Sequence, residues 1–331
     1  MTTVYELKDV AFDYGQGFGL KDINVQIDTS CITAIVGPNG SGKTTLLNLF
    51  AFLTVPSSGE LRYNNRLLKD NDIAQFKKSV GYIQQNPYLL RGSVQDNVEL
   101  GLKLRHINKA ERSKRALDMM HLLGIEKLAD RNARSLSGGE AQKVAIAQVM
   151  VLEPQVLILD EPFTFLDKNA IHDLELLILK LRNDLGKTII FTTHNQYQAQ
   201  WLSDQVYSVI KGKLFKSLLL NLFTGELDKI NNYLDIGAHK VILPEATSHV
   251  EHIAIDPKLI VLSKQRHNPS MQNSYPGKII GMLEDNGLIK VSVDTGEKFQ
   301  AIISHESLQE LDLSMGEEIW IGFKTSSIVI F

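Results

Sequence analysis

The segment GPNGSGKTT at residues 37–45 constrains the fold more than any other part of the sequence, because it lies between two apolar runs. The run before it, CITAIV, predicts a fully buried strand, and the leucine-rich run after it predicts a helix. Its three glycines allow backbone conformations that other residues avoid, so the chain can turn tightly from strand to helix. A strand, glycine loop and helix in this order favour an α/β domain.

The same segment fits the pattern G-x-x-x-x-G-K-[ST]. Glycines let backbone N–H groups turn inward around phosphate oxygens, and the following helix presents its positive end to them. Lys43 would neutralise the β and γ phosphates, and the Thr44 hydroxyl would bind Mg²⁺. The alternative, a glycine turn without a ligand, needs neither side chain. We therefore predict a nucleotide site made by Gly37, Pro38, Asn39, Gly40, Ser41, Gly42, Lys43, Thr44 and Thr45.

A second element, VLILDEP at residues 156–162, predicts a buried strand that ends in two acids. Carboxylates at the end of a strand lie at the edge of the sheet where ligands bind in α/β folds. Asp160 is the natural ligand of Mg²⁺, and Glu161 is the candidate base that polarises the attacking water. The alternative is an ordinary acidic turn before Pro162. The phosphate loop in the same sequence favours the nucleotide site over that alternative.

A third element, LSGGE, opens the predicted helix EAQKVAIAQVMVL. Ser137, Gly138, Gly139 and Glu140 again form a helix start that favours anions. One domain therefore carries two phosphate sites, and one ATP molecule cannot use both within one chain if they lie far apart.

The organisation of the chain suggests two domains, since 331 residues exceed what one hydrophobic core usually serves. Strands and helices alternate over roughly the first 215 residues, with helices predicted from Asn108 to Gly124 and from Asp167 to Gly186. Short β-rich runs separated by turn residues follow. We predict an α/β domain at 1–221 and a small all-β barrel at 222–331.

Composition excludes several classes of protein. The formal net charge of −3 implies no general attraction to nucleic acid or to anionic membranes. No apolar run approaches the ~20 residues that cross a bilayer. The single cysteine, Cys31, excludes an internal disulfide, and the start MTTVYELKDV does not follow the plan of a signal peptide. We expect a cytoplasmic protein.

The motifs GPNGSGKTT, YIQQNP, LSGGE, VLILDEP, FLD and TTH, in this order, resemble the motif series of the ATP-binding cassette (ABC) ATPases over approximately residues 1–215. The resemblance implies an α/β P-loop NTPase cassette with a helical signature subdomain, which hydrolyses ATP with Mg²⁺. It also implies a head-to-tail homodimer, in which the phosphate loop of one copy and the LSGGE helix of the other enclose each ATP.

The resemblance also assigns roles to single residues. It makes Tyr14 the platform for adenine, Gln85 a ligand of Mg²⁺ and water, His194 the sensor of the γ-phosphate, and Asp167 a contact across the dimer. Tyr14 could instead be an ordinary aromatic residue at a strand end, and His194 a polar residue at a helix start. Gln84 is the alternative to Gln85, which we favour because Asn86-Pro87 follows it.

The sequence departs from the family pattern in three places. The signature ends in Glu140 where glutamine is commoner, and Gln148 stands where arginine is frequent. In FTFLD, larger residues precede Asp167 where the family usually has small ones. These departures bear on the rate of hydrolysis, since none removes a group that phosphoryl transfer to water needs.

The segment after Gln85, PYLLRGSVQDNV, resembles the surface that grips a cytoplasmic helix of an integral-membrane permease. Tyr88, Leu89 and Leu90 are candidate apolar anchors, although Leu89 and Leu90 could equally belong to the core. A soluble ABC ATPase that acts on DNA or ribosomes would need a long coiled coil or a second cassette and a basic surface, and the sequence has neither. We expect a peripheral protein at the cytoplasmic face of the membrane.

The last hundred residues resemble the molybdate-binding type of β-barrel that is appended to many importer ATPases, with VSVDTG, IISHESLQELDLSMGE and FKTSS as its motifs. The family's S-A-R-N pattern stands here as Ser270-Met271-Gln272-Asn273, without its arginine. A tetrahedral oxyanion needs N–H and O–H donors with a cation. The candidates are Ser270, Asn273, Lys324, Ser326 and Ser327.

The resemblance therefore implies the ATP-hydrolysing subunit of an importer for molybdate or tungstate, fed by an extracytoplasmic binding protein. In this interpretation the barrel binds the imported oxyanion and regulates the ATPase. Alternatives remain at this point: Lys324 could be a solvated strand residue, the barrel could serve only packing and dimerisation, and similar barrels accompany importers of sulfate, iron, polyamines and sugars.

Overall fold

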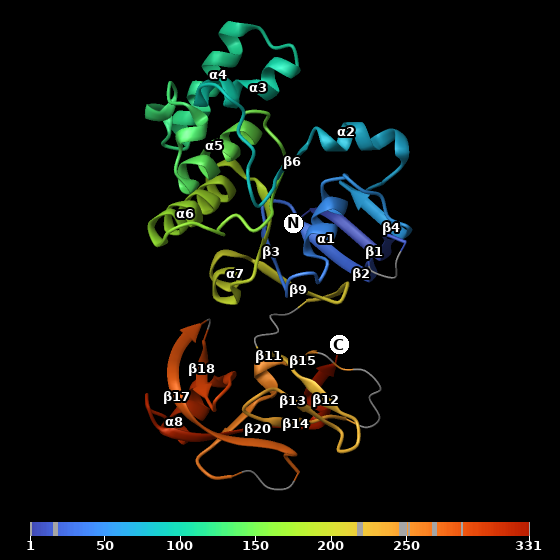
Figure 1. The fold of residues 1–331 in the computed structure, drawn as a ribbon, viewed down its shortest axis with the longest axis vertical. Coiled ribbons are helices and arrows are strands. Elements are labelled where there is room, and N and C mark those ends of the chain that lie inside the picture. Colours follow the sequence, from blue (N-terminus) through green and yellow to red (C-terminus); the bar gives the residue numbers. More distant parts are fainter. Residues whose placement is uncertain are drawn as a thin grey trace. The chain divides into compact units, whose positions relative to one another are not determined.

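A computed structural model describes residues 2–15, 19–216, 221–244, 250, 252–266, 270–285 and 287–330. The chain divides into two compact units, Met1–Ser217 and Leu218–Phe331 (Figure 1). The sequence predicts the boundary between 221 and 222. In the structure the division lies between 217 and 218, and Asn221 begins the first strand of the second unit.

The first unit is an α/β structure, as predicted. Its strands are β1 Thr3–Asp13, β2 Gly19–Asp28, β3 Ile32–Val36, β4 Ser58–Tyr63, β5 Arg66–Leu67, β6 Val80–Ile83, β7 Val156–Leu159, β8 Thr188–Thr193, β9 Gln205–Ile210 and β10 Lys213–Phe215. Its α-helices are α1 Lys43–Phe50, α2 Ile73–Lys77, α3 Val94–Leu104, α4 Lys109–Leu122, α5 Gly138–Met150, α6 Lys168–Leu185 and α7 Gln196–Leu202.

A six-stranded sheet of order β10-β9-β3-β8-β7-β6 organises this unit. Strands β9, β3, β8, β7 and β6 run parallel, and β10 pairs antiparallel with β9. The carboxyl ends of parallel strands meet at one edge, where ligands bind in such folds. The glycine loop follows β3, the pair Asp160-Glu161 follows β7, and His194 follows β8, so the predicted motifs share this edge.

Two hydrophobic cores cover the two faces of the sheet. One contains Ile35 and Ile158 with α1 and the antiparallel sheet β2-β1-β4-β5. The other contains Ala34 and Leu159 with residues of α3, α4, α5 and α6. Neighbouring residues of each strand face opposite cores, as the pleat of a strand dictates. Every residue of β3, β7 and β8 is buried, which explains their continuous apolar runs.

The two longest predicted helices are confirmed, together with their ends. The Asn108 side chain caps α4 by accepting from the N–H of Glu111. Asp167 caps α6 in the same way, and Gly186 ends it in the left-handed conformation. These positions follow the ordinary preferences for helix caps, so the sequence predicts them well.

The second unit is β-rich, as predicted. Its elements are β11 Asn221–Thr224, β12 Glu226–Asp228, β13 Tyr233–Asp235, β14 Lys240–Ile242, β15 His252–Ile255, β16 Val261–Ser263, β17 Asn273–Asp285, β18 Leu288–Asp294, β19 Lys298–Ser304, α8 His305–Glu310, β20 Glu318–Phe323 and β21 Ile328–Ile330.

The described strands of this unit form three antiparallel sheets, β11-β15-β21, β12-β13-β14 and β16-β20-β17-β18-β19, around one hydrophobic core. Two buried asparagines join the sheets. Asn221 bonds the backbone of Ile255 and Gln300, and Asn273 bonds the backbone of Ile242. Among the described residues of the chain, no helix combines the length and the apolar character that crossing a membrane requires.

Candidate active site

The glycine loop is built so closely against β9 that one position accepts only glycine. A Cβ atom at Gly37, where φ is 154°, would lie 2.1 Å from the backbone oxygen of Val209. Gly42 caps α1 with φ of 110°, in a region that glycine reaches without strain. The loop therefore turns directly from β3 into the N-terminus of α1, which is the geometry expected of a phosphate-binding loop.

Lys43 is the first residue of α1 and is 6% exposed. Its Nζ donates hydrogen bonds to the backbone oxygens of Gly37 (2.9 Å) and Pro38 (3.2 Å). The same Nζ lies 3.5 Å from Oε1 of Glu161. A buried ammonium group is thus held against the loop and next to the proposed base, which is where phosphate oxygens would need a positive charge.

Asp160 is 7% exposed, and three hydroxyl groups donate to its carboxylate. Thr44 donates to Oδ2 at 2.8 Å, Thr192 to Oδ1 at 2.6 Å and Tyr82 to Oδ2 at 3.4 Å. Burial and the neighbouring Asp160 carboxylate raise the pKa of the Tyr82 hydroxyl, so Tyr82 stays a donor.

The backbone of Glu161 has a left-handed conformation, with φ of 43°, which is uncommon for a residue other than glycine. Its N–H donates to Oγ1 of Thr192 at 2.7 Å, and Thr192 itself donates to Asp160. One buried threonine therefore holds both acids of the VLILDEP motif, and the bond to its oxygen holds the unusual backbone of Glu161 in place.

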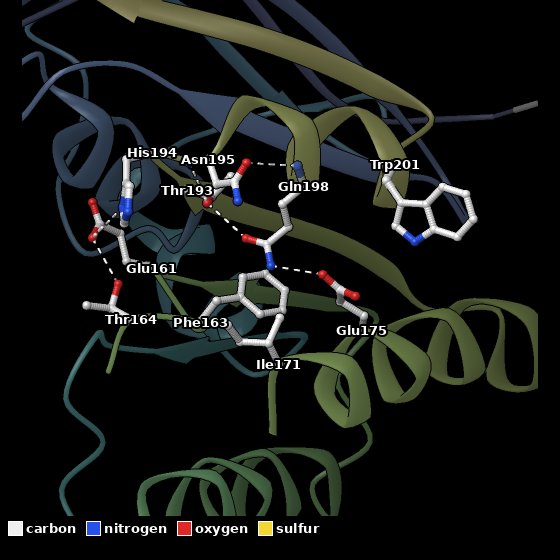
Figure 2. Close-up of a pocket in the computed structure, with 10 residues that line it drawn as sticks. All are labelled: Glu161, Phe163, Thr164, Ile171, Glu175, Thr193, His194, Asn195, Gln198 and Trp201. Atoms are coloured by element: carbon white, nitrogen blue, oxygen red, sulfur yellow. Dashed lines mark hydrogen bonds and ion pairs between the residues drawn. The ribbon is translucent and has the colours of Figure 1, made fainter. Parts of the chain in front are cut away.

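The side chain of Glu161 is the centre of a polar cluster at the edge of the sheet (Figure 2). Its Oε2 accepts from Gln85 Nε2 (3.3 Å) and Thr164 Oγ1 (3.2 Å), and lies 3.9 Å from Nδ1 of His194. Thus Gln85, which we preferred over Gln84, contacts the proposed base. The side chain of His194 is 70% exposed, in keeping with a residue that meets a ligand.

Tyr14 lies near the phosphate loop. It is 55% exposed, its hydroxyl is 3.4 Å from Oγ1 of Thr45, and its ring packs edge-on against Phe12 at a centroid distance of 4.8 Å. An exposed ring beside the loop is available for stacking on a base.

The LSGGE motif lies elsewhere in the unit. Ser137 caps α5, and its N–H donates to Oε2 of Glu140 at 2.8 Å in a reciprocal capping box. A pocket of about 380 Å³ is lined by Ser137, Gly139, Glu140 and Asp167 among others. Helices α1 and α5 pack on opposite faces of the six-stranded sheet and are well separated in Figure 1.

The structure therefore brings the predicted residues of the first unit into two groups. The glycine loop, Gln85, Asp160, Glu161 and His194 form one group, and the LSGGE residues with Asp167 form the other.

The oxygen donors around Asp160 fit a magnesium ion. Mg²⁺ prefers oxygen ligands and is commonly held by one or two carboxylates together with substrate phosphates. Thr44 Oγ1 and the Asp160 carboxylate are 2.8 Å apart, and the Gln85 side chain contacts the adjacent Glu161. The described residues contain no group of three or more His, Cys, Asp and Glu side chains that would form an all-protein metal site.

Sequence reasoning missed Thr192, Thr164 and Tyr82, although each donates to one of the two acids. Thr192 carried one usable signal: it lies in the apolar run KTIIFTT, and a buried hydroxyl needs a partner. No spacing rule pointed to Tyr82 or Thr164.

The candidate oxyanion residues come together only in part. Asn273 in β17 pairs with Phe323 in β20, so the segments 270–273 and 324–327 adjoin. Asn273 is 1% exposed, and its amide bonds both backbone groups of Ile242 (2.8 and 3.0 Å). By contrast, the side chains of Ser270, Lys324 and Ser326 are exposed.

Comparison with known proteins places the chain in a family. A family model described as "ABC transporter" matches residues 20–164. The molybdate/tungstate import ATP-binding protein WtpC of Pyrococcus abyssi is 32% identical over 98% of this chain and 99% of its own length. The sulfate/thiosulfate import ATP-binding protein CysA of Halalkalibacterium halodurans is 27% identical over 95% of each.

Two solved structures share the fold. The cbiO1 protein of Clostridium perfringens, part of the ABC transporter complex cbiONQ, matches with a TM-score of 0.62 and 33% identity, over 65% of this chain and 88% of its own. The dimeric post-hydrolysis state of the cassette MJ0796 bound to ADP and Pi matches with a TM-score of 0.57 and 29% identity, over 64% and 98%. The chain belongs to the ABC transporter family and is one of its ATP-binding, ATP-hydrolysing subunits.

Proposed function

We propose that the cluster at the edge of the six-stranded sheet hydrolyses ATP by direct attack of water. The loop N–H groups and Lys43 bind the β and γ phosphates, and Tyr14 stacks on adenine. Glu161 accepts a proton from the attacking water, whose oxygen bonds to the γ phosphorus while the bond to the β–γ bridging oxygen breaks. His194 contacts the γ-phosphate. The contacts of Glu161 with Lys43, Gln85 and His194 support this assignment.

Thr44, Asp160 and Gln85 would hold the magnesium ion, which neutralises charge on the phosphates when it is bound. Thr192 keeps the Asp160 carboxylate oriented toward Thr44. Hydrogen bonds within the chain therefore hold these side chains in position before the nucleotide and the ion bind.

We propose that two copies of the chain associate head to tail. Ser137, Gly138, Gly139 and Glu140 of one copy, with Asp167, then contact the ATP bound in the glycine loop of the other. The separation of the two groups supports this arrangement, since α1 and α5 lie on opposite faces of one sheet. Two copies related by a two-fold axis make this contact twice, so the dimer is closed and encloses two nucleotides.

We propose that the segment after Gln85 contacts an integral-membrane permease. Tyr88 is 74% exposed and Leu90 is 42% exposed, whereas Leu89 is 8% exposed and belongs to the core. Leu89 is therefore removed from the candidate anchors. Asn97, which is buried in α3, fixes the loop by bonding the backbone N–H and oxygen of Leu90. The protein would accordingly lie at the cytoplasmic face of the membrane as a peripheral subunit.

We propose molybdate or tungstate as the imported substrate, delivered by an extracytoplasmic binding protein. The observation that carries this proposal is the similarity to the molybdate/tungstate import relative, which extends over 98% of this chain and so includes the second unit. Import of sulfate or thiosulfate is the second candidate, because a relative of that kind also aligns over most of the chain.

We propose further that the second unit binds the oxyanion and reports its internal concentration to the ATPase. Exposed Lys324 and Ser326 supply a cation and a hydroxyl donor, with Ser270 and Ser327 adjoining. Asn273 acts here by holding β14 against β17, because both ends of its amide are bonded to Ile242.

Uptake by the source organism tests the substrate. Cells that lack this chain should lose uptake of labelled molybdate and tungstate, and the wild-type chain should restore it while the Glu161→Gln variant does not. Loss of sulfate uptake alone would assign the chain to the second candidate. Full uptake of all three anions without the chain would contradict a role in import of any of them.

Binding to the purified full-length chain tests the sensor. A Trp201→Phe variant leaves Trp320 of β20 as the only tryptophan. Tungstate and molybdate should change its fluorescence in a saturable way, and sulfate should not. No heat and no fluorescence change with any of these anions would reduce the second unit to a structural role.

A further inference from the structure

His194 is held in place by its neighbours along the chain and hardly at all by its own side chain. The imidazole is 70% exposed, and its Nδ1 lies 3.9 Å from Oε2 of Glu161. In contrast, Thr193 immediately before it is 3% exposed at the end of β8. The position of the imidazole must therefore come from the backbone on either side of it.

Gln198 in α7 forms hydrogen bonds with the side chains of both residues that flank His194 (Figure 2). Its Oε1 accepts from the Thr193 hydroxyl at 3.1 Å, and its backbone N–H donates to Oδ1 of Asn195 at 3.2 Å. The N–H of Asn195 donates in turn to the Thr193 hydroxyl at 3.1 Å. The two residues that flank His194 are thus joined to each other and to Gln198.

The other end of the same side chain reaches a different helix. Nε2 of Gln198 donates to Oε1 of Glu175 in α6 at 3.0 Å. Gln198 is 8% exposed, so water competes little for either bond. Helix α6 is capped at its N-terminus by Asp167, the proposed contact across the dimer. One glutamine therefore connects the backbone that carries His194 to the helix that begins at Asp167.

We propose that Gln198 and Glu175 are positioning residues for ATP hydrolysis, which act through His194. The pair fixes the Thr193–Asn195 backbone against α6, so that the imidazole is directed toward the Glu161 end of the pocket. This pocket, of about 330 Å³, is lined by Glu161, His194, Gln198 and Glu175 among others. The proposal rests on the function proposed above for His194 and extends it to two residues outside the motif series.

Substitution of Gln198 by methionine keeps the volume and removes both side-chain bonds. The Thr193 hydroxyl and the half-buried Glu175 carboxylate then lose this partner, so the backbone that carries His194 is no longer joined to α6, although the N–H of residue 198 keeps its bond to Asn195. Small displacements of a catalytic group are costly, so we expect kcat to fall about tenfold. The KM for ATP should stay the same, because the glycine loop and Lys43 are untouched.

A double-mutant cycle with His194→Ala separates positioning from general damage. If Gln198 acts through His194, Gln198→Met should lower kcat in the wild-type background and have no further effect once His194 is alanine. Glu175→Leu should behave like Gln198→Met, while Glu175→Gln keeps an acceptor oxygen and should lose much less. Gln205→Met, at the start of β9, is the matched control for loss of a partly buried amide.

The outcomes separate the positioning role of Gln198 and Glu175 from the role of His194 itself. Equal losses of kcat from Gln198→Met in both backgrounds, or an unchanged kcat in the folded variant, would overturn the positioning role and leave ATP hydrolysis by Glu161 intact. If His194→Ala itself leaves kcat unchanged, both the role of His194 and that of the pair are wrong. Melting temperatures measured in parallel show whether each variant folds. If Gln198→Met does not fold, Glu175→Leu takes its place in the double-mutant cycle.

Discussion

Polar side chains in the two units bind different kinds of group. In the first unit Thr192 and Thr44 both bond Asp160, and Lys43 lies 3.5 Å from Glu161, so side chains of different motifs meet. In the second unit Asn221 and Asn273 bond mainly to backbone groups of neighbouring sheets. Polar side chains that converge on each other indicate chemistry, whereas polar side chains that satisfy the backbone indicate architecture.

The two units also differ in how their candidate binding residues are arranged. Most residues of the nucleotide site follow the ends of four neighbouring parallel strands, β3, β8, β7 and β6, and already contact one another. In the second unit the exposed Lys324 and Ser326 lie in the segment that follows Phe323, the strand partner of Asn273, and the amide of Asn273 is bonded to Ile242. We therefore expect substitutions to affect catalysis in the first unit and mainly stability in the second.

Replacing Lys43 with methionine should have the largest effect. The side chain is buried against the loop, so its removal takes away the positive charge that meets the phosphates. We expect ATP affinity to fall by about 100-fold or more, measured by calorimetry, since losing one partner of a buried charged pair costs about 3–5 kcal/mol. The exposed Lys21→Met variant is the control, and ATP binding of equal strength in both variants would contradict the assignment.

Replacing Thr192 with valine should come next. Valine has the same shape without the hydroxyl, so Asp160 loses a donor and the N–H of Glu161 loses its acceptor. We expect kcat to fall about tenfold while ATP binding is retained, because bonds to charged groups contribute about 1.5–3 kcal/mol. Thr192→Ser should recover most of the activity. Equal kcat values for the serine and valine variants would show that the hydroxyl has no part in it.

Replacing Asn273 with leucine tests the architectural side of the comparison. The variant leaves both backbone groups of Ile242 without their side-chain partner in a buried place. We expect the free energy of unfolding of the second unit to fall by about 2 kcal/mol, which is measured as a lower melting temperature of its transition. Lys324→Met should leave that transition unchanged because the side chain is exposed. A greater loss from Lys324→Met than from Asn273→Leu would reverse the distinction between the units.

The smallest expected effect concerns Glu140, where the family more often has glutamine. The backbone N–H of Ser137, with help from Arg131, lowers the pKa of Glu140. A carboxyl whose pKa is lowered by folding stabilises the fold above its unfolded pKa, and this stabilisation is lost as the pH falls through the lowered pKa. Glu140→Gln should therefore cost up to about 1 kcal/mol at pH 7.

Urea unfolding of wild type and Glu140→Gln at several pH values measures this effect. The two free energies of unfolding should converge in acid, where the carboxyl is protonated in the wild type. A difference that grows as the pH falls has the wrong sign for this explanation.

Much of the first unit could be predicted because its signals are local. The glycine loop, the Asn108 and Asp167 caps and the strand that precedes Asp160 each follow from a few neighbouring residues. Thr192, Gln198 and Glu175 were not predicted, since they act across elements that only the fold brings together. Likewise, α8 was missed because HESLQE is short, and Leu89 could not be assigned to core or surface from its sequence neighbours.

The most direct test of the account is ATP hydrolysis by purified Glu161→Gln measured beside ATP binding. The amide keeps the shape of the side chain but cannot accept the proton of water, whereas the glycine loop and Lys43 remain. We predict ATP binding close to that of the wild type and phosphate release lowered by about 100-fold or more, with the exposed Glu126→Gln variant as control. Phosphate release at the wild-type rate would contradict the account, because the base would then lie outside the cluster at Glu161.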